Sequence, residues 1–225
     1  MRTGIARLAA AGCLTILLWV ASPDAAAAPY DFDDDAYLAP ATSLPDWADT
    51  VARNEVEQQI IAACLADEAA CHSRLKGIRH LLLKARDLPR EKQIRLVNRY
   101  VNKRRYRDDR SEYRMSSVSN REALIRNSWS TVMDFVRRGG DCEDYATTKY
   151  FLLRTLGFTS DDLRVLVVYD RRLRDYHAVL AVRSAPDSIW LLESDNTIQK
   201  SGLYGYRYVF AINEDSIWDH EGANG

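Results

Sequence analysis

The sequence GGDCEDYA, at residues 139–146, places a cysteine at the start of a predicted helix. The two glycines end one helix, and the next runs from Asp141 to about Leu156, where Gly157 stops it. The first turn of a helix presents free N–H groups and the positive end of the helix dipole. Both favour the thiolate of Cys142 over its thiol, and the N–H groups can also bind a tetrahedral oxyanion. This stretch therefore predicts a nucleophilic cysteine.

Helical patterns precede this stretch, and alternating patterns follow it. Apolar spacing predicts helices over residues 47–64, 73–85 and 89–103, and Asn120 and Ser130 are typical N-caps of two further short helices. Period-two alternation predicts strands over residues 163–169, 176–182, 189–193 and 204–212. Helices followed by an antiparallel sheet indicate the α+β class, with a helical N-terminal half and the nucleophile at a helix N-terminus.

The composition is that of an ordinary globular protein. The 225 residues include 31 Lys or Arg and 32 Asp or Glu, and 47% of the residues are hydrophobic. A net charge of −1 lacks the excess of positive charge that is typical of proteins that bind nucleic acid. No apolar run of about 20 residues occurs beyond the N-terminus, so we expect no membrane span after signal removal.

The N-terminus has the features of a secretory signal. Residues 1–28 combine two arginines, an apolar run and a small-residue cleavage site. A retained membrane anchor and a lipoprotein signal ending at Cys13 are the weaker alternatives. Residues 29–46 are acidic and contain proline, so we expect a flexible leader, and residues 47–225 then form one domain. We expect a periplasmic protein, in a compartment that permits disulfides.

Cys64 and Cys71 are either a disulfide or two buried thiols. Seven residues of continuous helix rise about 10.5 Å, whereas a disulfide needs Cα atoms within about 7 Å. The two cysteines can therefore pair only if the helix breaks between them, which residues 65–70 allow. Pairing is the favoured alternative, and it leaves Cys142 as the odd cysteine.

Two later residues could complete a site around the thiol. His177 lies in a predicted strand, where a histidine is most often a satisfied core residue, yet a base is what Cys142 needs. Asp195 follows the next strand and could fix the tautomer of the imidazole, although an Asp-Asn pair is also an ordinary turn. A register shift would bring Glu193 inward in its place. We expect a catalytic triad of Cys142, His177 and Asp195.

Three carboxylates adjoin the thiol, and they oppose its ionisation. Asp141, Glu143 and Asp144 favour the helix start, but their negative charge raises the pKa of Cys142. A bound Ca²⁺ would neutralise them, so we expect calcium to be required for activity. A zinc site is disfavoured, because no second cysteine or paired histidine has the required spacing.

The region from Tyr106 to Trp218 resembles the bacterial transglutaminase-like cysteine proteinase family. The matching features are the DCEDYA run at 141–146, the HAVL strand at 177–180, Asp195-Asn196 and several aromatic positions. The resemblance implies a papain-like or transglutaminase-like fold, the Cys142–His177–Asp195 triad, and calcium bound through Asp141 and Glu143, with Asp144 a further candidate. It also implies that the protein cleaves a large cell-surface adhesin near the adhesin's N-terminus, at a di-alanine motif, to control biofilm attachment. An inner-membrane cyclic-di-GMP receptor that sequesters the protease is implied as well. The family's aspartate usually follows an apolar residue, whereas Ser194 precedes it here.

Two other functions remain open at this stage. The same triad would serve transglutaminase or amidase chemistry, which amine incorporation into a glutamine donor would distinguish from hydrolysis. A calcium-dependent binding module without catalysis is the other alternative, and the complete Cys/His/Asp set argues against it.

Overall fold

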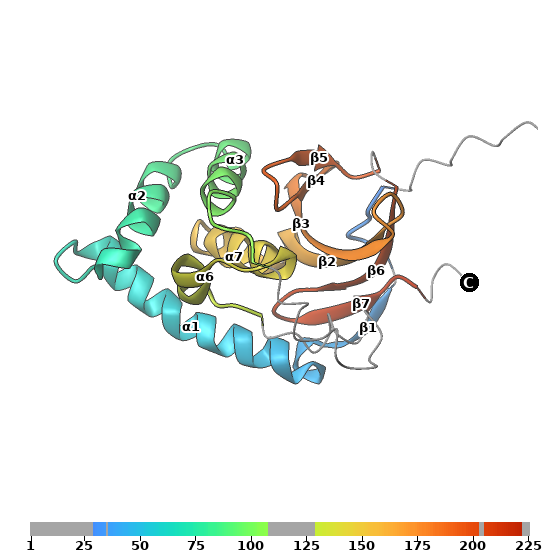
Figure 1. Ribbon diagram of the computed structural model, residues 1–225, viewed down its shortest axis with the longest axis horizontal. Coiled ribbons are helices and arrows are strands. Elements are labelled where there is room, and N and C mark those ends of the chain that lie inside the picture. Colours follow the sequence, from blue (N-terminus) through green and yellow to red (C-terminus); the bar gives the residue numbers. More distant parts are fainter. Residues whose placement is uncertain (1–28, 35, 108–128, 203–204, 222–225) are drawn as a thin grey trace, which may run out of the picture.

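The computed structural model describes residues 29–34, 36–107, 129–202 and 205–221. After one short strand, helices fill the first part of the chain and strands the second, so the predicted α+β class is confirmed (Figure 1). The predicted signal at 1–28 and the predicted helix after Asn120 lie outside these residues. Among the described helices, none has the length and apolar character that crossing a membrane requires.

The longest helix, α1, covers Pro45–Ala66 and contains the first cysteine of a disulfide. Proline suits its first position, because the ring fixes φ at a helical value and the missing N–H has no partner there. The helix ends where Asp67 adopts an extended backbone. This break returns the chain, so that the Cα atoms of Cys64 and Cys71 lie 4.2 Å apart and the two sulfurs are bonded. The favoured pairing is therefore confirmed.

The helix that begins at Cys142 is central. The helices over 90–101 and 132–138 pack directly against it, whereas the helix over 76–85 packs against α1 and the helix over 90–101. Thr131, rather than the predicted Ser130, caps the helix that begins at Val132, because its hydroxyl accepts the N–H of Asp134 at 3.2 Å. The central helix is buried along residues 142–153, whereas the others bury one stripe each. The bounds are α2 Lys76–Ala85, α3 Arg90–Val101, α6 Val132–Arg138 and α7 Cys142–Thr155.

In the described part of the chain, seven strands form one antiparallel sheet in the order β1-β7-β6-β2-β3-β4-β5. The predicted strands correspond to β2, β3, β4 and β6. The other three have only three or four residues, which is too short for alternation to be visible in the sequence. The bounds are β1 Tyr37–Pro40, β2 Leu163–Asp170, β3 Asp175–Ala185, β4 Ser188–Leu192, β5 Ile198–Lys200, β6 Tyr206–Ile212 and β7 Ser216–Asp219.

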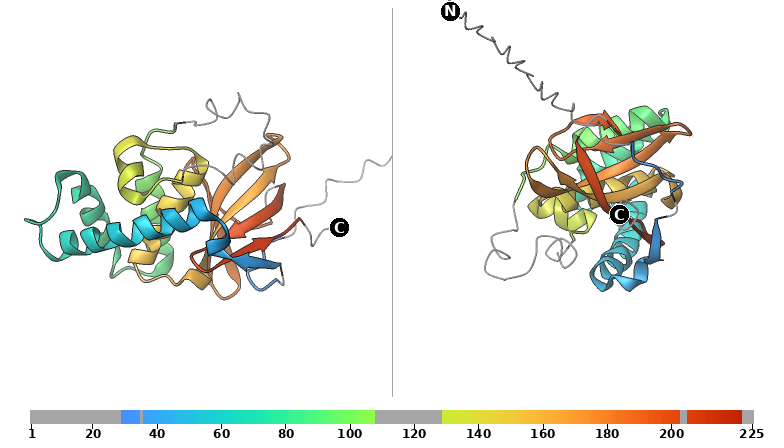
Figure 2. Two further views of the ribbon diagram at one scale, coloured as in Figure 1. Left: turned by 90° about the horizontal axis from the view of Figure 1, so that it is seen from below. Right: turned by 90° about the vertical axis from the view of Figure 1, so that its right-hand side faces the viewer.

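The sheet is covered on both faces, and the alternation of its strands divides the core in two. Val165 and Val167 of β2 join the core shared with the helices, which lie on one side of the sheet (Figure 2). Leu166 and Val168 point to the opposite face and join a second core. The central strands are therefore buried on both sides, which explains why they read as nearly continuous apolar runs.

The N-terminal segment covers that second face. Tyr30 and Phe32 are buried in the second core, and β1 pairs with β7. Arg164 donates to the hydroxyl of Tyr30 at 2.9 Å and to the carbonyl of Phe32 at 2.6 Å, and its guanidinium lies 3.6 Å from the ring centroid of Trp218. The predicted flexible leader over residues 29–46 is therefore wrong for its described residues, because two aromatic anchors within an acidic stretch hold it on the sheet.

We expect Arg164→Ala to lower the free energy of unfolding by about 2–4 kcal/mol, because it removes two buried hydrogen bonds and a cation–π contact. Urea denaturation followed by circular dichroism measures this. Arg171→Ala, at an exposed position on the adjacent turn, is the control and should change stability by less than about 0.5 kcal/mol. Equal effects of the two substitutions would show that Arg164 does not anchor the segment.

Candidate active site

The backbone before α7 fixes the position of Cys142, the first residue of that helix. Gly139 has φ +75°, and a Cβ on it would lie 2.1 Å from the carbonyl oxygen of Arg105. A Cβ on Gly140 would lie 1.9 Å from Oδ2 of Asp144. Both positions therefore require glycine, because a side chain at either would collide with neighbouring atoms.

The segment after α3 holds this glycine pair in place. The N–H of Arg107 donates to the carbonyl of Gly140 at 2.8 Å, and Tyr106 forms a β-bridge with the same glycine. The hydroxyl of Tyr145, on the first turn of α7, donates to the carbonyl of Arg104 at 2.6 Å. The start of α7 is thus linked by hydrogen bonds to a segment some 35 residues earlier in the chain.

The sulfur of Cys142 reaches the edge of β3 at a gap in the sheet. The ladder between β3 and β4 begins only at Leu180 and Leu192, so Ala178 precedes it. The backbone N–H of Ala178 interacts with the sulfur. Because Ala178 directly follows His177, the structure brings the predicted nucleophile and the predicted base to the same place on the strand.

His177 is oriented by Glu193, not by Asp195. Its Nε2 lies 2.9 Å from Oε2 of Glu193, whose side chain is 7% exposed. This contact leaves Nδ1 as the nitrogen that is available to exchange a proton with the thiol. The predicted role of Asp195 is therefore corrected, and the register alternative that brings Glu193 inward is the arrangement observed.

Asp195 instead forms the turn between β4 and β5. Its side chain accepts the N–H of Thr197 at 2.9 Å, the ordinary turn arrangement of an aspartate. Burial raises the pKa of Asp195, but the hydrogen bonds from Thr197 and the charge of His177 outweigh it, so the pKa lies below its usual value. Asp195 therefore interacts with the imidazole of His177 through charge alone, without a hydrogen bond.

Four further side chains hold Glu193. Gln199 and Tyr206 donate to its Oε1 at 2.7 Å and 2.9 Å. Lys149 and Asn102 donate to its main-chain carbonyl at 2.6 Å and 2.8 Å. Sequence reasoning assigned none of these roles, since the four residues come from helices and strands far apart in the chain.

Lys149 is fully buried beside this carboxylate. Burial lowers its pKa to about 7, although the negative charges of Glu193 and Asp195 act in the opposite direction. Its Nζ also lies 5.7 Å from the ring centroid of Tyr145. The buried amine of Lys149 thus connects α7 to the main chain of the residue that contacts His177.

The thiol lies in an environment that opposes its ionisation. Burial raises the pKa of Cys142 well above its usual value, and the charges of Glu143 and Asp141 add to the effect. The sulfur donates to Oε2 of Glu143 at 3.1 Å. The interaction with Ala178 lowers the pKa, but it does not outweigh these contributions. Without a cation, the protonated thiol is therefore the favoured form.

The three predicted calcium ligands are all buried at the start of α7. Burial raises the pKa of Glu143, and its Oε1 is a buried atom without a hydrogen-bond partner in the described structure. Asp144 accepts the N–H of Ser130 at 2.7 Å. Within the described ranges, no three His, Cys, Asp or Glu side chains converge into a complete metal site. Asp141 and Glu143 supply buried carboxylate oxygens of the kind that a hard cation prefers, and backbone carbonyls or water would have to complete the shell.

The chain is similar to a known protein family. The profile of the family described as bacterial transglutaminase-like cysteine proteinase matches residues 55–220. A search of curated protein sequences finds no match.

Solved structures of LapG from Legionella pneumophila share the fold. The calcium-bound form is 24% identical, with a TM-score of 0.59, and the match covers 73% of this chain and 88% of that one. A second LapG structure is 23% identical, with a TM-score of 0.56, over 74% of this chain and 91% of that one. An EGTA-treated form is 24% identical, with a TM-score of 0.57, over 74% and 87%.

We expect Glu143→Gln to lower the pKa of Cys142 by about one unit in protein kept free of calcium by a chelator, because it removes the carboxylate charge nearest the sulfur. The rate of iodoacetamide alkylation against pH reports this pKa, and Cys142 is the one free cysteine in the described residues. Glu55→Gln, at an exposed position on α1, should leave the profile unchanged. If the alkylation profile of Glu143→Gln is the same as that of the unmodified protein, this carboxylate does not raise the pKa of Cys142.

Proposed function

Because this chain belongs to the bacterial transglutaminase-like cysteine proteinase family, we propose that it is a cysteine endopeptidase with a triad of Cys142, His177 and Glu193. The observation that carries the proposal is the 2.9 Å contact between His177 and Glu193. It is supported by the interaction of the Cys142 sulfur with the backbone of Ala178, beside that histidine. Cysteine, imidazole and carboxylate thereby meet the requirements for nucleophile, base and orienting group.

The reaction follows from these positions. The Cys142 sulfur attacks the carbonyl carbon of the peptide bond while its proton passes to Nδ1 of His177. The imidazolium returns that proton to the departing amine as the carbon–nitrogen bond breaks, and water then hydrolyses the thioester. Glu193 holds the Nε2 proton and stabilises the imidazolium. Free N–H groups at the start of α7 bind the oxyanion.

Calcium is the second part of the proposal. Asp141 and Glu143 would hold the ion, and Asp144 is a further ligand candidate. The bound cation would offset the negative charge that opposes thiolate formation. The orphaned Oε1 of Glu143 supports this assignment, as does the existence of a calcium-bound structure of LapG, which shares the fold.

The resemblance of the sequence to this family also carries proposals for the substrate, the location and a partner. We propose a periplasmic enzyme, exported by residues 1–28, that cleaves a large surface adhesin at a di-alanine site and so controls biofilm attachment. An inner-membrane cyclic-di-GMP receptor would sequester it. The support for this substrate, location and partner is the set of motifs around Cys142, His177 and Asp195-Asn196.

We expect Glu193→Gln to reduce kcat/KM by about 10²–10⁴, because an amide cannot stabilise the imidazolium or fix the required tautomer. Hydrolysis of a quenched fluorescent peptide containing Ala-Ala measures this. Asp195→Asn is the matched control and should cost less than about tenfold, since Asp195 only contributes to the field around His177. A larger loss in Asp195→Asn than in Glu193→Gln would return the orienting role to Asp195.

We expect EGTA to reduce hydrolysis of the same peptide by at least about tenfold, and CaCl₂ to restore it. Calcium should also raise the melting temperature, because an ion that binds only the folded chain stabilises it. Glu143→Gln should weaken both responses, whereas Glu55→Gln should retain them. Full activity under strong chelation, with no calcium-dependent shift in melting, would contradict the calcium assignment.

A further inference from the structure

The helix pair α2 and α3, with the segment that follows it, holds a concentration of positive charge that the proposed chemistry does not use. Residues 74–107 contain 13 Lys or Arg and two Asp or Glu, a net charge of +11, whereas the whole chain has a net charge of −1. The remainder of the chain is therefore strongly acidic. Segregated charge of this kind attracts partners of the opposite sign.

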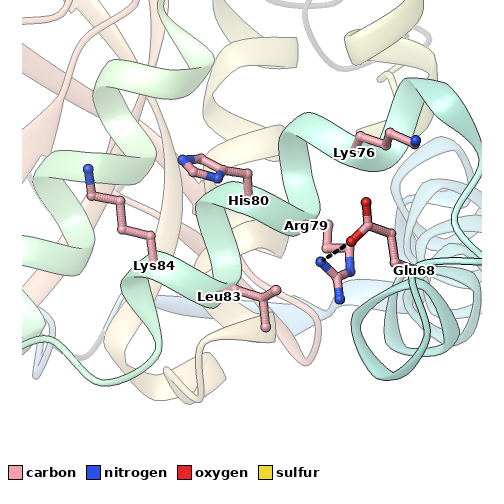
Figure 3. Close-up of a pocket in the computed structure, with 6 residues that line it drawn as sticks. All are labelled: Glu68, Lys76, Arg79, His80, Leu83 and Lys84. Atoms are coloured by element: carbon pink, nitrogen blue, oxygen red, sulfur yellow. Dashed lines mark hydrogen bonds and ion pairs between the residues drawn. The ribbon is translucent and has the colours of Figure 1, made fainter.

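Two adjoining hollows lie on this charged region. One, of about 680 Å³, flanks α2, where Lys76, His80 and Lys84 follow one another at one-turn intervals (Figure 3). The other, of about 420 Å³, lies between α2 and α3 and is also bordered by His80 and Lys84. Arg99 and Lys103 of the α3 side line this second hollow. We refer to the two hollows together as the basic groove.

Most of the charge in the basic groove is not neutralised within the protein. Arg79 pairs with Glu68 at 3.3 Å, and the dashed contact in Figure 3 marks this pair. In the part of the chain that the structure describes, no carboxylate lies within ion-pair distance of Lys84, Arg99 or Lys103. These three side chains therefore remain available to a bound anion.

One residue that lines the basic groove is next in the chain to a residue that contacts Glu193. Lys103 directly follows Asn102, whose side chain donates to the carbonyl of Glu193 at 2.8 Å. Leu96, which also lines the groove, lies seven residues before Lys103, so the groove runs for about 10 Å along this part of the chain. In Figure 1, α3 lies between α2 and the end of the sheet that carries β4 and β5.

We propose that the basic groove binds an acidic, partly apolar segment of the protein substrate, at a distance from the bond that is cleaved. This inference rests on the proposed function and adds a determinant of substrate choice to it. Lys84, Arg99 and Lys103 supply charge for Asp or Glu side chains, and Leu81 and Leu96 supply an apolar floor for residues between them.

The shape and composition of the groove favour a polypeptide over a lipid surface. The large apolar side chains that are exposed in the described structure are Tyr37, Leu38, Val56, Ile60, Tyr106 and Leu173. None of them lies on α2 or α3 or lines the basic groove, so the groove itself offers no group for insertion into a bilayer. A concave surface between two helices instead matches an extended or helical segment of protein.

Binding to the Cys142→Ala protein tests the groove without any need for catalysis. The probe is a short fluorescein-labelled peptide in which Glu and Asp alternate with Leu and Ala, compared with its Gln and Asn counterpart by fluorescence anisotropy. We expect the acidic peptide to bind at least about tenfold more tightly and to weaken as salt rises. Equal binding of the two peptides would overturn the proposal.

A charge-reversed groove is compared with a control variant in which three charges elsewhere in residues 74–107 are reversed. Lys84→Glu/Arg99→Glu/Lys103→Glu should weaken binding of the acidic peptide by at least about tenfold. Arg74→Glu/Arg86→Glu/Lys92→Glu changes the net charge equally at exposed positions outside the groove, and should weaken binding by less than about threefold. Equal losses would mean that only the overall charge matters, which overturns the proposal. If the reversed variant does not fold, replacement of the same three residues by Gln gives the same comparison with a smaller loss.

Two further measurements separate this inference from the proposed function. The quenched Ala-Ala peptide, extended with the acidic or the neutral segment, should show a higher KM in the groove variant for the acidic extension alone. Groove-dependent binding without hydrolysis by the unmodified enzyme would contradict the peptidase and keep the groove. Hydrolysis by the unmodified enzyme, with no change in peptide binding or KM in the groove variant, would support the peptidase and contradict the groove. Retained peptide binding in the groove variant, with loss of binding to anionic phosphatidylglycerol vesicles, would assign the groove to a membrane and overturn the proposal.

Discussion

The arrangement of the site depends on one contact, between the first turn of α7 and the edge of β3. The β3–β4 ladder begins at Leu180, so the backbone N–H of Ala178 is free to interact with the sulfur of Cys142. The glycine pair at 139–140 permits this approach, because neither position has space for a Cβ. A helix buried along most of its length then has no freedom to move the thiol away. The proposed nucleophile and the proposed base are therefore positioned by the packing of the core, and not by a loop.

The same burial that positions the thiol also works against its chemistry. A desolvated sulfur beside Glu143 and Asp141 favours the protonated form, so the helix dipole alone does not produce a thiolate. These carboxylates sit at the positive end of the helix, where their charge stabilises the fold. The sequence thus combines groups that favour the fold and oppose the reaction. This conflict is the physical reason for expecting a cation at the site, since a positive charge would serve both requirements.

Local patterns predicted the parts of the structure that depend on neighbouring residues. The helix that begins at Cys142 and the strand that contains His177 both follow from short-range periodicity. The choice between Glu193 and Asp195 did not, because it depends on where β4 stops and how the chain turns into β5. The N–H of Glu193 pairs with the carbonyl of Thr197, and Asn196 adopts φ +76°, so the turn takes Asp195 outward. The aromatic anchors at 30 and 32 were missed for a similar reason, since their partner Arg164 lies far along the chain.

Glu193 links the orientation of the imidazole to the burial of Lys149. The folded pKa of that lysine, about 7, lies below its ordinary value of 10.5, so the unfolded chain binds more protons between these two values. Stability contributed by the neutral amine is therefore present at high pH and is lost as the pH falls towards 7. The negative charges of Glu193 and Asp195 reduce this loss, because they favour the ammonium form. A neutral residue at 193 would lower the pKa of Lys149 further, while Lys149 would still hold the main-chain carbonyl as a neutral donor. The carboxylate that orients His177 thus also compensates a buried charge, so its conversion to an amide changes two titrations together.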